Sequence, residues 1–291
     1  MTDMRIGSLF SGAGGLDLAV EHIFGATVAW HCENDPAASK VLAHHWPGVP
    51  NLGDVTEIDW AQVEPVDILC GGWPCQPFSL AGKRKGVDDE RALWPEVDRA
   101  IRALRPRIIV LENIPAVLGP EFSRVASSLA ACGYEFTWTC LRASDVGAPY
   151  RRDRIFILAT DADRGGLEEL TERHRGPGEP GLSASQRDDA VRCGDGAEIE
   201  AGAWGEYWPA VGRWSRLSRP APALAESDRN GKPRLNPAFP EWMHGWPAGW
   251  VTDPEIGISR NDQLRCIGNG VVIQQAVAAL RWLISVCEVA A

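Results

Sequence analysis

One thiol, Cys75, stands between two prolines in the segment Gly-Gly-Trp-Pro-Cys-Gln-Pro-Phe-Ser at residues 71–79. The apolar run before it, residues 67–70, predicts a buried strand that ends at this loop. Proline fixes its own φ angle and pushes the preceding residue into extended backbone, so we expect the thiol to project from a stiff loop. Ligands bind at such strand ends in open α/β sheets. A cysteine beside proline, taken alone, is more often an inert thiol than a nucleophile, so its neighbours must decide.

A second reactive group, the carboxyl of Glu112, follows the β-branched run at residues 107–111. The carboxyl ends of parallel strands lie at one edge of a sheet, so Cys75 and Glu112 can meet over one substrate. A carboxyl group after a buried strand is otherwise often a helix cap. Pro115 makes a helix start awkward at this point, which favours an active-site acid.

The chain opens with a strand at residues 5–10, a glycine-rich loop at 11–15 and an apolar-periodic helix to about residue 24. Glycines let the backbone approach a ligand closely, and a helix N-terminus offers free N–H groups. The loop lacks both the lysine of a P-loop and the spacing of G-x-G-x-x-G, which disfavours ATP and NAD. As a lone motif such a loop is more often only a tight turn.

A second strand, at residues 27–33, ends in Glu33. An acid roughly 20 residues past a glycine-rich loop is placed to bond ribose hydroxyls. The alternative is a solvated glutamate at a strand end.

Several spaced motifs together resemble those of the DNA (cytosine-5)-methyltransferases, and they follow the family's order. They are Phe10–Gly15, Pro74-Cys75-Gln76, Glu112-Asn113-Ile114, Arg152-Asp153-Arg154 and Gly268-Asn269-Gly270-Val271. The segment at residues 235–247 is similar to the family's ninth motif, with Ala238-Phe239 where the family has Arg-Glu. Tyr150 occupies the glutamine position of the family's Gln-x-Arg-x-Arg pattern. The resemblance leaves only the middle of the chain without a counterpart.

The resemblance implies an α/β chain with a Rossmann-like S-adenosylmethionine-dependent methyltransferase fold and a small inserted target-recognition domain. We expect a catalytic and cofactor-binding domain at residues 1–160, the target-recognition domain at 161–264, and a C-terminal helix at 265–291 that returns to the catalytic domain. That helix should open at Gly268–Val271, run to about Val286 with one apolar stripe, and fold back against the first strand.

The resemblance also implies the roles of individual residues. The catalytic set is Cys75, Glu112, Arg152 and Arg154. The cofactor-binding set is Phe10, Ser11, Gly12, Gly14, Gly15, Glu33, Asp54, Val55, Pro74, Asn269 and Val271. The DNA-binding set is Gln76, Ser79, Lys83, Arg84, Lys85, Asn113, Arg213 and Arg216, with the three basic residues at 83–85 expected to close over DNA as a lid. No metal site is expected.

The implied reaction moves a methyl group from S-adenosyl-L-methionine to C5 of a cytosine flipped out of double-stranded DNA, through a covalent adduct between Cys75 and C6. The nearest alternative is a tRNA cytosine-5 methyltransferase of the same fold. A catalytically silent DNA-binding relative is a more distant one, which would have lost Cys75 or Glu112. A cognate restriction endonuclease acting separately is a possible partner, and we expect a monomer.

Residues 161–233 change in character, with Gly, Glu, Arg, Asp and Pro dominating and apolar periodicity fading. The stretch from Trp204 to Leu217 mixes tryptophans with Arg213 and Arg216, which suits either DNA contact or a small core. We expect this segment to choose the DNA sequence, with the two arginines as readers, and its acidic first half to stay away from DNA.

The net charge of −10 is unusual for a DNA-binding protein and alone would favour a metabolic enzyme. Residues 83–107 are locally basic, however, which is compatible with one DNA-facing cleft. Eight cysteines without any C-x-x-C pair support neither a zinc site nor a disulfide framework. No apolar run of about 18 residues and no signal peptide is found, so no membrane association and a cytoplasmic location are expected.

Overall fold

A computed structural model describes residues 4–74, 93–164 and 204–290 of the chain. Its centre is a sheet in which the described strands follow the order β2-β1-β3-β4-β6-β5. Four strands are parallel: β1 (Arg5–Leu9), β2 (Thr27–Cys32), β3 (Ile68–Gly71) and β4 (Ile108–Asn113). The last two, β5 (Tyr134–Arg142) and β6 (Asp153–Asp161), form a hairpin in which β6 runs antiparallel to β4.

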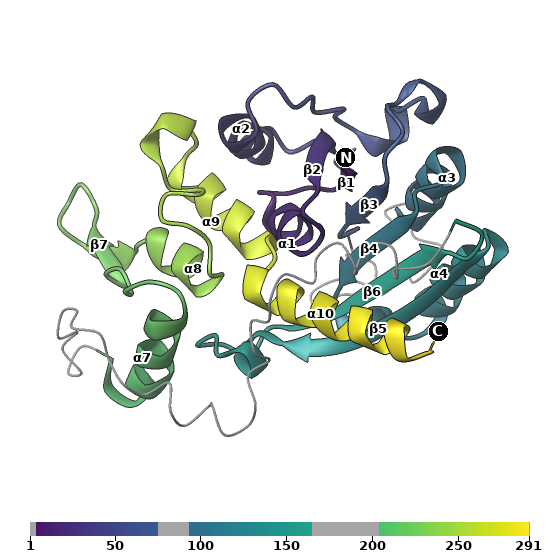
Figure 1. Ribbon diagram of the computed structural model, residues 1–291. Coiled ribbons are helices and arrows are strands. Elements are labelled where there is room, and N and C mark those ends of the chain that lie inside the picture. Colours follow the sequence, from purple (N-terminus) through teal and green to yellow (C-terminus); the bar gives the residue numbers. More distant parts are fainter. Residues whose placement is uncertain (1–3, 75–92, 165–203, 291) are drawn as a thin grey trace.

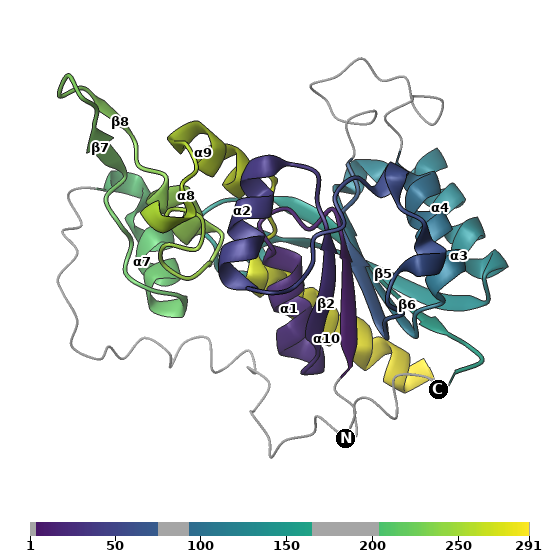
Figure 2. The same cartoon turned by 90° about the horizontal axis from the view of Figure 1, so that it is seen from above.

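Successive side chains along each buried strand point alternately into two apolar layers, one on each face of the sheet. One layer joins the sheet to α1 (Gly15–Phe24) and α10 (Ile273–Ala290), and the other joins it to α3 (Trp94–Leu104) and α4 (Pro120–Ala131). Figures 1 and 2 show these helix pairs on opposite faces of the sheet. In β4, for example, Val110 belongs to the first layer and Leu111 to the second. The pattern is that of a three-layer α/β fold, as predicted.

One more helix and several 3-10 turns lie in the connections between the strands. They are α2 (Pro36–His45), η1 (Val55–Glu57), η2 (Trp60–Gln62), η4 (Pro115–Val117) and η5 (Ala143–Val146). Asp35 caps α2, since its side chain accepts from the N–H groups of Ala37 and Ala38. A single parallel bridge between His31 and Asn51 continues the sheet one step beyond β2.

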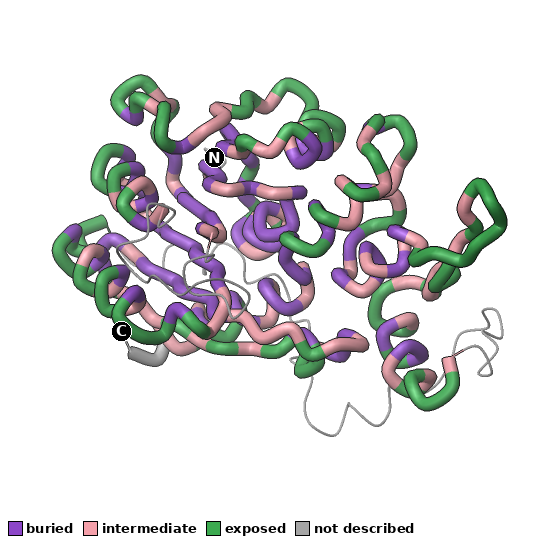
Figure 3. The backbone as a smooth tube through the Cα atoms, turned by 180° about the vertical axis from the view of Figure 1, so that it is seen from behind, coloured by how far each residue is buried: buried purple, intermediate pink, exposed green. Residues whose placement is uncertain are grey.

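A second, smaller unit follows the gap at residues 165–203. It contains η7 (Gly205–Tyr207), α7 (Trp208–Leu217), the hairpin β7 (Ala225–Ser227) and β8 (Pro233–Leu235), α8 (Ala238–Met243), η8 (Pro254–Ile256) and α9 (Arg260–Asn269). Its small core includes Trp214, Phe239 and Trp242. Figure 3 shows that buried positions concentrate in the central sheet, while the β7–β8 hairpin is exposed.

The expected C-terminal helix needs a correction, because α9 ends at Asn269 and α10 begins only at Ile273. The indole of Trp246 lies where a Cβ on Gly270 would sit, with ring atoms 2.3 and 2.4 Å away, and its Nε1 donates to the carbonyl oxygen of Val271. Trp246 therefore fills the break between the two helices. The expected boundary at residues 264 and 265 falls inside α9.

The apolar stripe of α10 is buried as predicted, and its most extensive neighbours are α1, β5 and β6 rather than the first strand itself. The stripe comprises Ala276, Ala279, Leu280 and Leu283, with Val272 just before the helix. The stretch Arg260–Cys287, which spans α9, the break at residues 270–272 and most of α10, is apolar and long enough to cross a membrane by length and composition alone. Its α10 part nevertheless closes the core of the sheet, which is the ordinary place of such a helix in a folded domain.

Candidate active site

The glycine-rich loop between β1 and α1 has left-handed backbone at three positions. Phe10, Gly12 and Gly14 have φ angles of 51°, 55° and 81°. The hydroxyl of Ser11 donates to the carbonyl oxygen of Ser8 at 3.2 Å and fixes the turn. No atom lies within 4 Å of the position of a Cβ on Gly12, so the loop has open space beside its backbone. A ligand can therefore approach this backbone closely.

The carboxylate of Glu33, at the end of β2, holds this loop in place. One of its oxygens accepts from the N–H of Gly12 and the other from the N–H of Asp35, both at 2.7 Å. Burial raises the pKa of Glu33, although these two hydrogen bonds oppose the shift. A residue predicted to contact a cofactor thus also orders the loop that would hold it.

Asp54 lies beside the carboxyl end of β2 and caps η1. Its carboxylate accepts from the backbone N–H of Thr56 at 2.9 Å and from the side-chain amide of Asn34 at 3.0 Å. These hydrogen bonds, with that of Thr56 first, lower the pKa of Asp54. Its neighbour Val55 is buried in the sheet core. Asp54 is therefore a fixed, ionised acceptor close to Glu33.

The glycine-rich loop, Glu112 and the C-terminal motif line one pocket. The predicted residues around it are Phe10, Ser11, Gly12, Gly15, Glu112, Asn269 and Val271. Gly15 allows close packing here, because a Cβ would lie 2.9 Å from the carbonyl oxygen of Val271 and 3.1 Å from Nε1 of Trp246. Segments separated by more than 200 residues in sequence are thereby brought into one site.

Glu112 ends β4 and is 9% exposed. Nε of Arg154, from the neighbouring strand β6, lies 2.7 Å from Oε1 of Glu112. Burial raises the pKa of Glu112, while the positive charges of Arg154 and Arg152 act in the opposite direction. The site therefore holds a carboxyl group that takes up a proton more readily than an exposed glutamate.

Asn113 was predicted to contact DNA, but its side chain is only 3% exposed. Its amide donates to the carbonyl oxygen of Trp73 at 3.0 Å, and its side-chain oxygen accepts from the N–H of Ile114. In this structure Asn113 fixes the segment Trp73-Pro74 that leads into residue 75. Its burial has a simple cause: alternation along β4 points Asn113 into the layer opposite to that of Glu112.

Arg152 is a support of the site. Its guanidinium donates to the carbonyl oxygen of Gly268 at 3.2 and 3.3 Å and to that of Gly270, which ties the start of β6 to the end of α9. Its φ angle of 32° is strained for a residue with a side chain. The amide of Gln275 donates to the backbone oxygen of Arg152 at 2.9 Å and holds this conformation. Burial lowers the pKa of Arg152.

Tyr150, at the position where the family pattern has glutamine, connects the sheet to α8. Its hydroxyl lies 3.2 Å from Nε2 of His244. Nδ1 of His244 lies 2.9 Å from the carbonyl oxygen of Pro240, which can only accept, so Nδ1 carries the proton and Nε2 accepts from Tyr150. Burial lowers the pKa of His244 to about 3 and raises that of Tyr150 to about 12, so both groups are neutral near pH 7.

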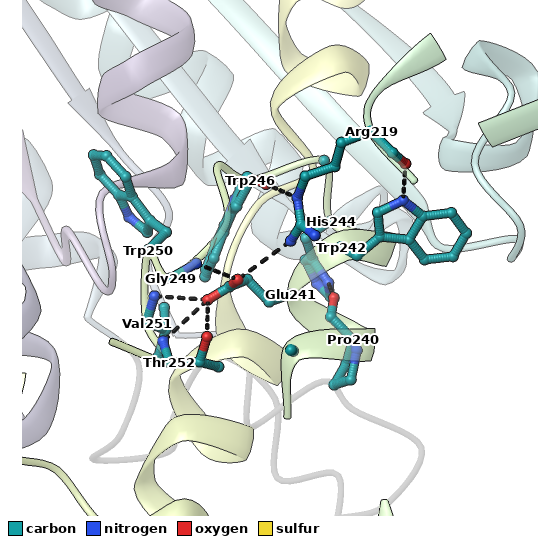
Figure 4. A network of polar contacts seen from close by, with 12 residues as sticks. Arg219, Pro240, Glu241, Trp242, His244, Trp246, Gly249, Trp250, Val251 and Thr252 are labelled. Atoms are coloured by element: carbon teal, nitrogen blue, oxygen red, sulfur yellow. Dashed lines mark hydrogen bonds and ion pairs between the residues drawn. The ribbon is translucent and has the colours of Figure 1, made fainter. Parts of the chain in front are cut away.

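The segment similar to the ninth motif is organised by the buried carboxylate of Glu241 (Figure 4). Its oxygens accept from the backbone N–H groups of Gly249, Val251 and Thr252 at 2.8 to 3.0 Å, and Arg219 lies 3.3 Å away. The loop that it shapes carries Trp250, whose Nε1 donates to the carbonyl oxygen of Ala13 at 2.7 Å. Glu241 thus connects the smaller unit to the glycine-rich loop.

The remaining predicted residues divide into two groups. Arg213 and Arg216 are exposed on α7, where Nε of Arg213 lies 3.5 Å from the carbonyl oxygen of Gly147. The tryptophans beside them serve the small core: Trp214 is fully buried, and Trp204 stacks on Phe239. The other group lies outside the described residues and comprises Cys75, Gln76, Ser79, Lys83, Arg84 and Lys85.

Sequence reasoning did not single out His244, Gln275 or Glu241. Some of their partners lie far away along the chain, such as Arg219, 22 residues from Glu241, and Leu141, 134 residues from Gln275. The usable signal was weak: a glutamate and a histidine inside a segment rich in tryptophan at residues 239–250. Buried polar side chains need partners, so their placement in an apolar segment predicts a network without naming its members.

Comparison with known proteins agrees with this arrangement. The family described as "C-5 cytosine-specific DNA methylase" matches residues 4–187. The type II methylase M.HgiEI of Herpetosiphon aurantiacus is 37% identical over 54% of this chain, but the chain spans only 37% of that relative's length. The type II methyltransferase M2.BsuMI of Bacillus subtilis strain 168 is 29% identical over 93% of this chain and 73% of that protein.

Solved structures show the same fold. The Dnmt2 methyltransferase of S. pombe superposes with a TM-score of 0.64 at 14% identity, covering 98% of this chain and 99% of that one. A putative DNA modification methyltransferase encoded in an E. coli prophage superposes with a TM-score of 0.59 at 19% identity, covering 97% and 100%. With the family match spanning residues 4–187, these findings establish that the chain belongs to the C-5 cytosine-specific DNA methylase family.

Proposed function

We propose that this chain transfers a methyl group from S-adenosylmethionine to C5 of a cytosine flipped out of duplex DNA. The observation that carries the proposal is the pairing of Glu112 with Arg154 at 2.7 Å, in a pocket shared with the glycine-rich loop. A buried acid beside an arginine can bind the edge of a flipped base, and the loop offers a place for a cofactor in contact with it. DNA is favoured over tRNA because the matching family is described as acting on DNA.

The residues of the pocket fit S-adenosylmethionine. Gly12 leaves open space beside a backbone that a ligand could approach, and Glu33 and Asp54 place two carboxylates nearby to accept from hydroxyl and amino groups. Asn269 and Val271 line the same pocket. When bound, S-adenosylmethionine supplies an electrophilic methyl group.

Cytosine C5 is a weak nucleophile, and the chain's own residues would overcome this. The Cys75 thiolate forms a bond to C6, which places electron density on C5; after C5 has gained the methyl group and lost its proton, the bond to Cys75 breaks by β-elimination. Glu112, with its raised pKa, donates a proton to N3 and stabilises the charge that develops in the ring. Arg154 holds the O2 side of the base, and Arg152 keeps the surrounding backbone in place.

We further propose that residues 161–264 select the DNA sequence and that residues 265–291 complete the catalytic domain. Arg213 and Arg216 are exposed on α7, which supports their role as readers of base edges. The same proposal includes duplex DNA as substrate, a cytoplasmic monomer, and a cognate restriction endonuclease that acts separately.

Replacement of the thiol tests the chemistry directly. We expect Cys75→Ser to abolish methyl transfer while binding of cofactor and DNA is largely retained, because a hydroxyl is a far weaker nucleophile at neutral pH. DNA containing 5-fluorocytosine should trap the unaltered chain as a covalent complex that withstands denaturation, since its C5 has no proton to lose. Near-normal turnover by Cys75→Ser would overturn the assignment.

Removal of the two carboxylates tests the cofactor site. Glu33→Ala and Asp54→Ala should each weaken S-adenosylmethionine binding by about 1 to 3 kcal/mol, measured by calorimetry. Glu33→Ala should have the larger effect, because it also releases the N–H of Gly12. Glu57→Ala, which removes an exposed carboxylate from η1, is the matched control and should leave the affinity unchanged. Unchanged affinity in both test variants would show that the cofactor binds elsewhere.

A further inference from the structure

The β7–β8 hairpin ends in a tightly bonded turn at residues 228–232. Oδ1 of Asp228 accepts from the N–H groups of Asn230 and Lys232, both at 2.8 Å. The N–H of Gly231 donates to the carbonyl oxygen of Asp228 at 3.0 Å, and the φ angle of Gly231 is 75°. The N–H of Asp228 donates to the carbonyl oxygen of Lys232 at 2.8 Å. These four hydrogen bonds, two of them accepted by the Asp228 side chain, make this tip a defined structure, so side chains on it start from fixed positions.

The acidic groups of the hairpin are already engaged, whereas two of its basic groups are not. Glu226 lies 2.9 Å from Nε of Arg234 and 3.4 Å from Nε of Arg260, which fastens the hairpin to α9. Asp228 is used within the turn. The side chains of Arg229 and Lys232 are exposed and form no hydrogen bond or ion pair with any residue that the structure describes. The tip therefore presents two unpaired positive charges to solvent.

The hairpin projects from the same side of the molecule as the active site. In Figure 2 it extends toward the top of the view, which is the direction in which the parallel strands run and in which the carboxyl ends of β3 and β4 lie. Figure 3 shows it exposed along its length. The hairpin tip and Glu112 thus lie toward the same side of the molecule, and the smaller unit separates them.

We propose that Arg229 and Lys232 contact phosphates of the DNA duplex beside the target base and thereby position the duplex over the active site, without reading its sequence. The inference rests on the proposed function and adds a contact to it. Phosphate contacts position and base contacts specify, and two separate flexible cations on a narrow tip suit phosphates better than a planar base edge. On a chain with a net charge of −10, such local positive charge is what a polyanion can bind.

The test compares two double variants with equal loss of charge. Arg229→Ala/Lys232→Ala removes the tip cations, and Arg5→Ala/Arg281→Ala removes a partly exposed arginine where β1 begins and an exposed one on α10. The dissociation constant for a DNA duplex of mixed sequence is measured between about 50 and 200 mM salt. Thermal unfolding of the tip variant should match that of the unaltered chain, because the tip side chains have no partners to lose among the described residues. The control variant loses the exposed ion pair of Arg5 with Glu64, so its folding is checked in the same way.

Loss of two phosphate contacts should lower the slope of log K against log salt by about 1.8, so that the unaltered chain loses roughly tenfold more affinity over this salt range than the tip variant does. The control variant should keep the original slope. The single substitution Arg229→Lys should also keep the original slope, since lysine retains the positive charge. Bisulfite sequencing of DNA from cells expressing the tip variant should show the same methylated motif as the unaltered chain, methylated less completely.

The proposal would be overturned if the slope of log K against log salt were unaltered in the tip variant, or if it fell equally in the control variant. A fall in slope with a relaxed methylation motif would also overturn it, because the tip would then read bases. Bisulfite sequencing of cells expressing Arg213→Ala/Arg216→Ala gives the contrasting case, in which a changed motif is expected. If the unaltered chain neither bound nor methylated DNA, the proposed function itself would fail, whatever the hairpin does.

Discussion

Glu112 depends on one neighbouring residue that lacks a side chain. A Cβ on Gly72 would lie 2.9 Å from Oε2 of Glu112, closer than carbon and oxygen atoms can pack. The displaced atom is the end of a side chain, so the fold can absorb the added methyl group by moving the carboxylate. Gly72 is therefore needed for the position of the Glu112 carboxylate more than for the stability of the sheet.

We therefore expect Gly72→Ala to lower the rate of methyl transfer by at least tenfold, since misplacement of a reacting group by about 1 Å can cost a hundredfold. The midpoint of thermal unfolding should change little. Gly119→Ala is the control, because nothing lies within 4 Å of its Cβ position and its φ angle of −175° is ordinary extended backbone. Normal turnover by Gly72→Ala would show that the carboxylate acts from another position.

The strand-end residues could be predicted from sequence because the physics behind them is local. A β-branched run followed by Glu112 predicts an acid at the sheet edge, and Gly12 beside Glu33 follows from strand, loop and strand lengths. The pairing of Glu112 with Arg154 required knowledge that β6 lies next to β4, which no pattern in either strand encodes. The burial of the Asn113 side chain was not predictable for a related reason, since it depends on what packs against that face of β4 in the folded chain.

At the scale of elements, the contact between Tyr150 and His244 joins the start of β6 to α8. Their ring centroids are 5.6 Å apart, and His244 also faces the charges of Arg152 and Arg154. Positive neighbours and burial both oppose a charged imidazole, and the hydrogen bond to Pro240 does not offset them. The connection therefore depends on a neutral histidine.

The pKa of His244, lowered from 6.5 to about 3, makes the fold sensitive to acid. The stabilisation is fully present above pH 6.5 and is lost as the pH falls toward 3, because the unfolded chain then binds a proton that the folded chain does not. Between pH 7 and pH 5 the unfolding free energy should fall by about 2 kcal/mol for this reason.

We expect His244→Gln to show a smaller fall in unfolding free energy between pH 7 and pH 5 than the unaltered chain, measured by urea denaturation. His44→Gln, which replaces an exposed imidazole on α2, should retain the original pH dependence. If the unfolding free energy of His244→Gln and of the unaltered chain fell by equal amounts between pH 7 and pH 5, a neutral, buried His244 would be contradicted.

Most helices and strands of the sheet were predictable to within a few residues, because apolar periodicity and the position of glycine and proline determine them. The break between α9 and α10 was not. It arises from Trp246, which lies 24 residues before Gly270 in sequence and inserts at that point only in the folded chain. The choice between DNA contact and a small core for the tryptophans at 204–217 likewise depended on Phe239 and Trp242, which sequence spacing does not bring together.

At the scale of the whole molecule, α10 completes a layer that begins with the first strand. Leu280 and Leu283 lie in one apolar cluster with Ile6 of β1 and Val20 of α1, although more than 250 residues separate them in sequence. The smaller unit is thus inserted into the sequence of a core that the chain's two ends build together.

Leu280→Ala should destabilise the chain by about 2 to 5 kcal/mol, since it opens a cavity in this layer. Trp282→Ala, on the same helix but 50% exposed, should change the unfolding free energy by about 0.5 kcal/mol or less. Denaturant unfolding followed by circular dichroism measures both. Equal effects of the two substitutions would mean that α10 does not close the core.

The position of α10 also sets an order of events during synthesis on the ribosome. Ile68, Val110 and Leu158 leave the ribosome long before Leu280, so the part of this apolar face of the sheet that α10 covers stays exposed, with only α1 in place, while the entire smaller unit is translated. The nascent sheet is therefore exposed to aggregation throughout that interval, and a chain halted within the inserted unit cannot bury it. Gly270 and Val271, which line the pocket beside the glycine-rich loop, also follow the smaller unit in sequence, so the pocket is completed only after the unit proposed to recognise DNA has been synthesised.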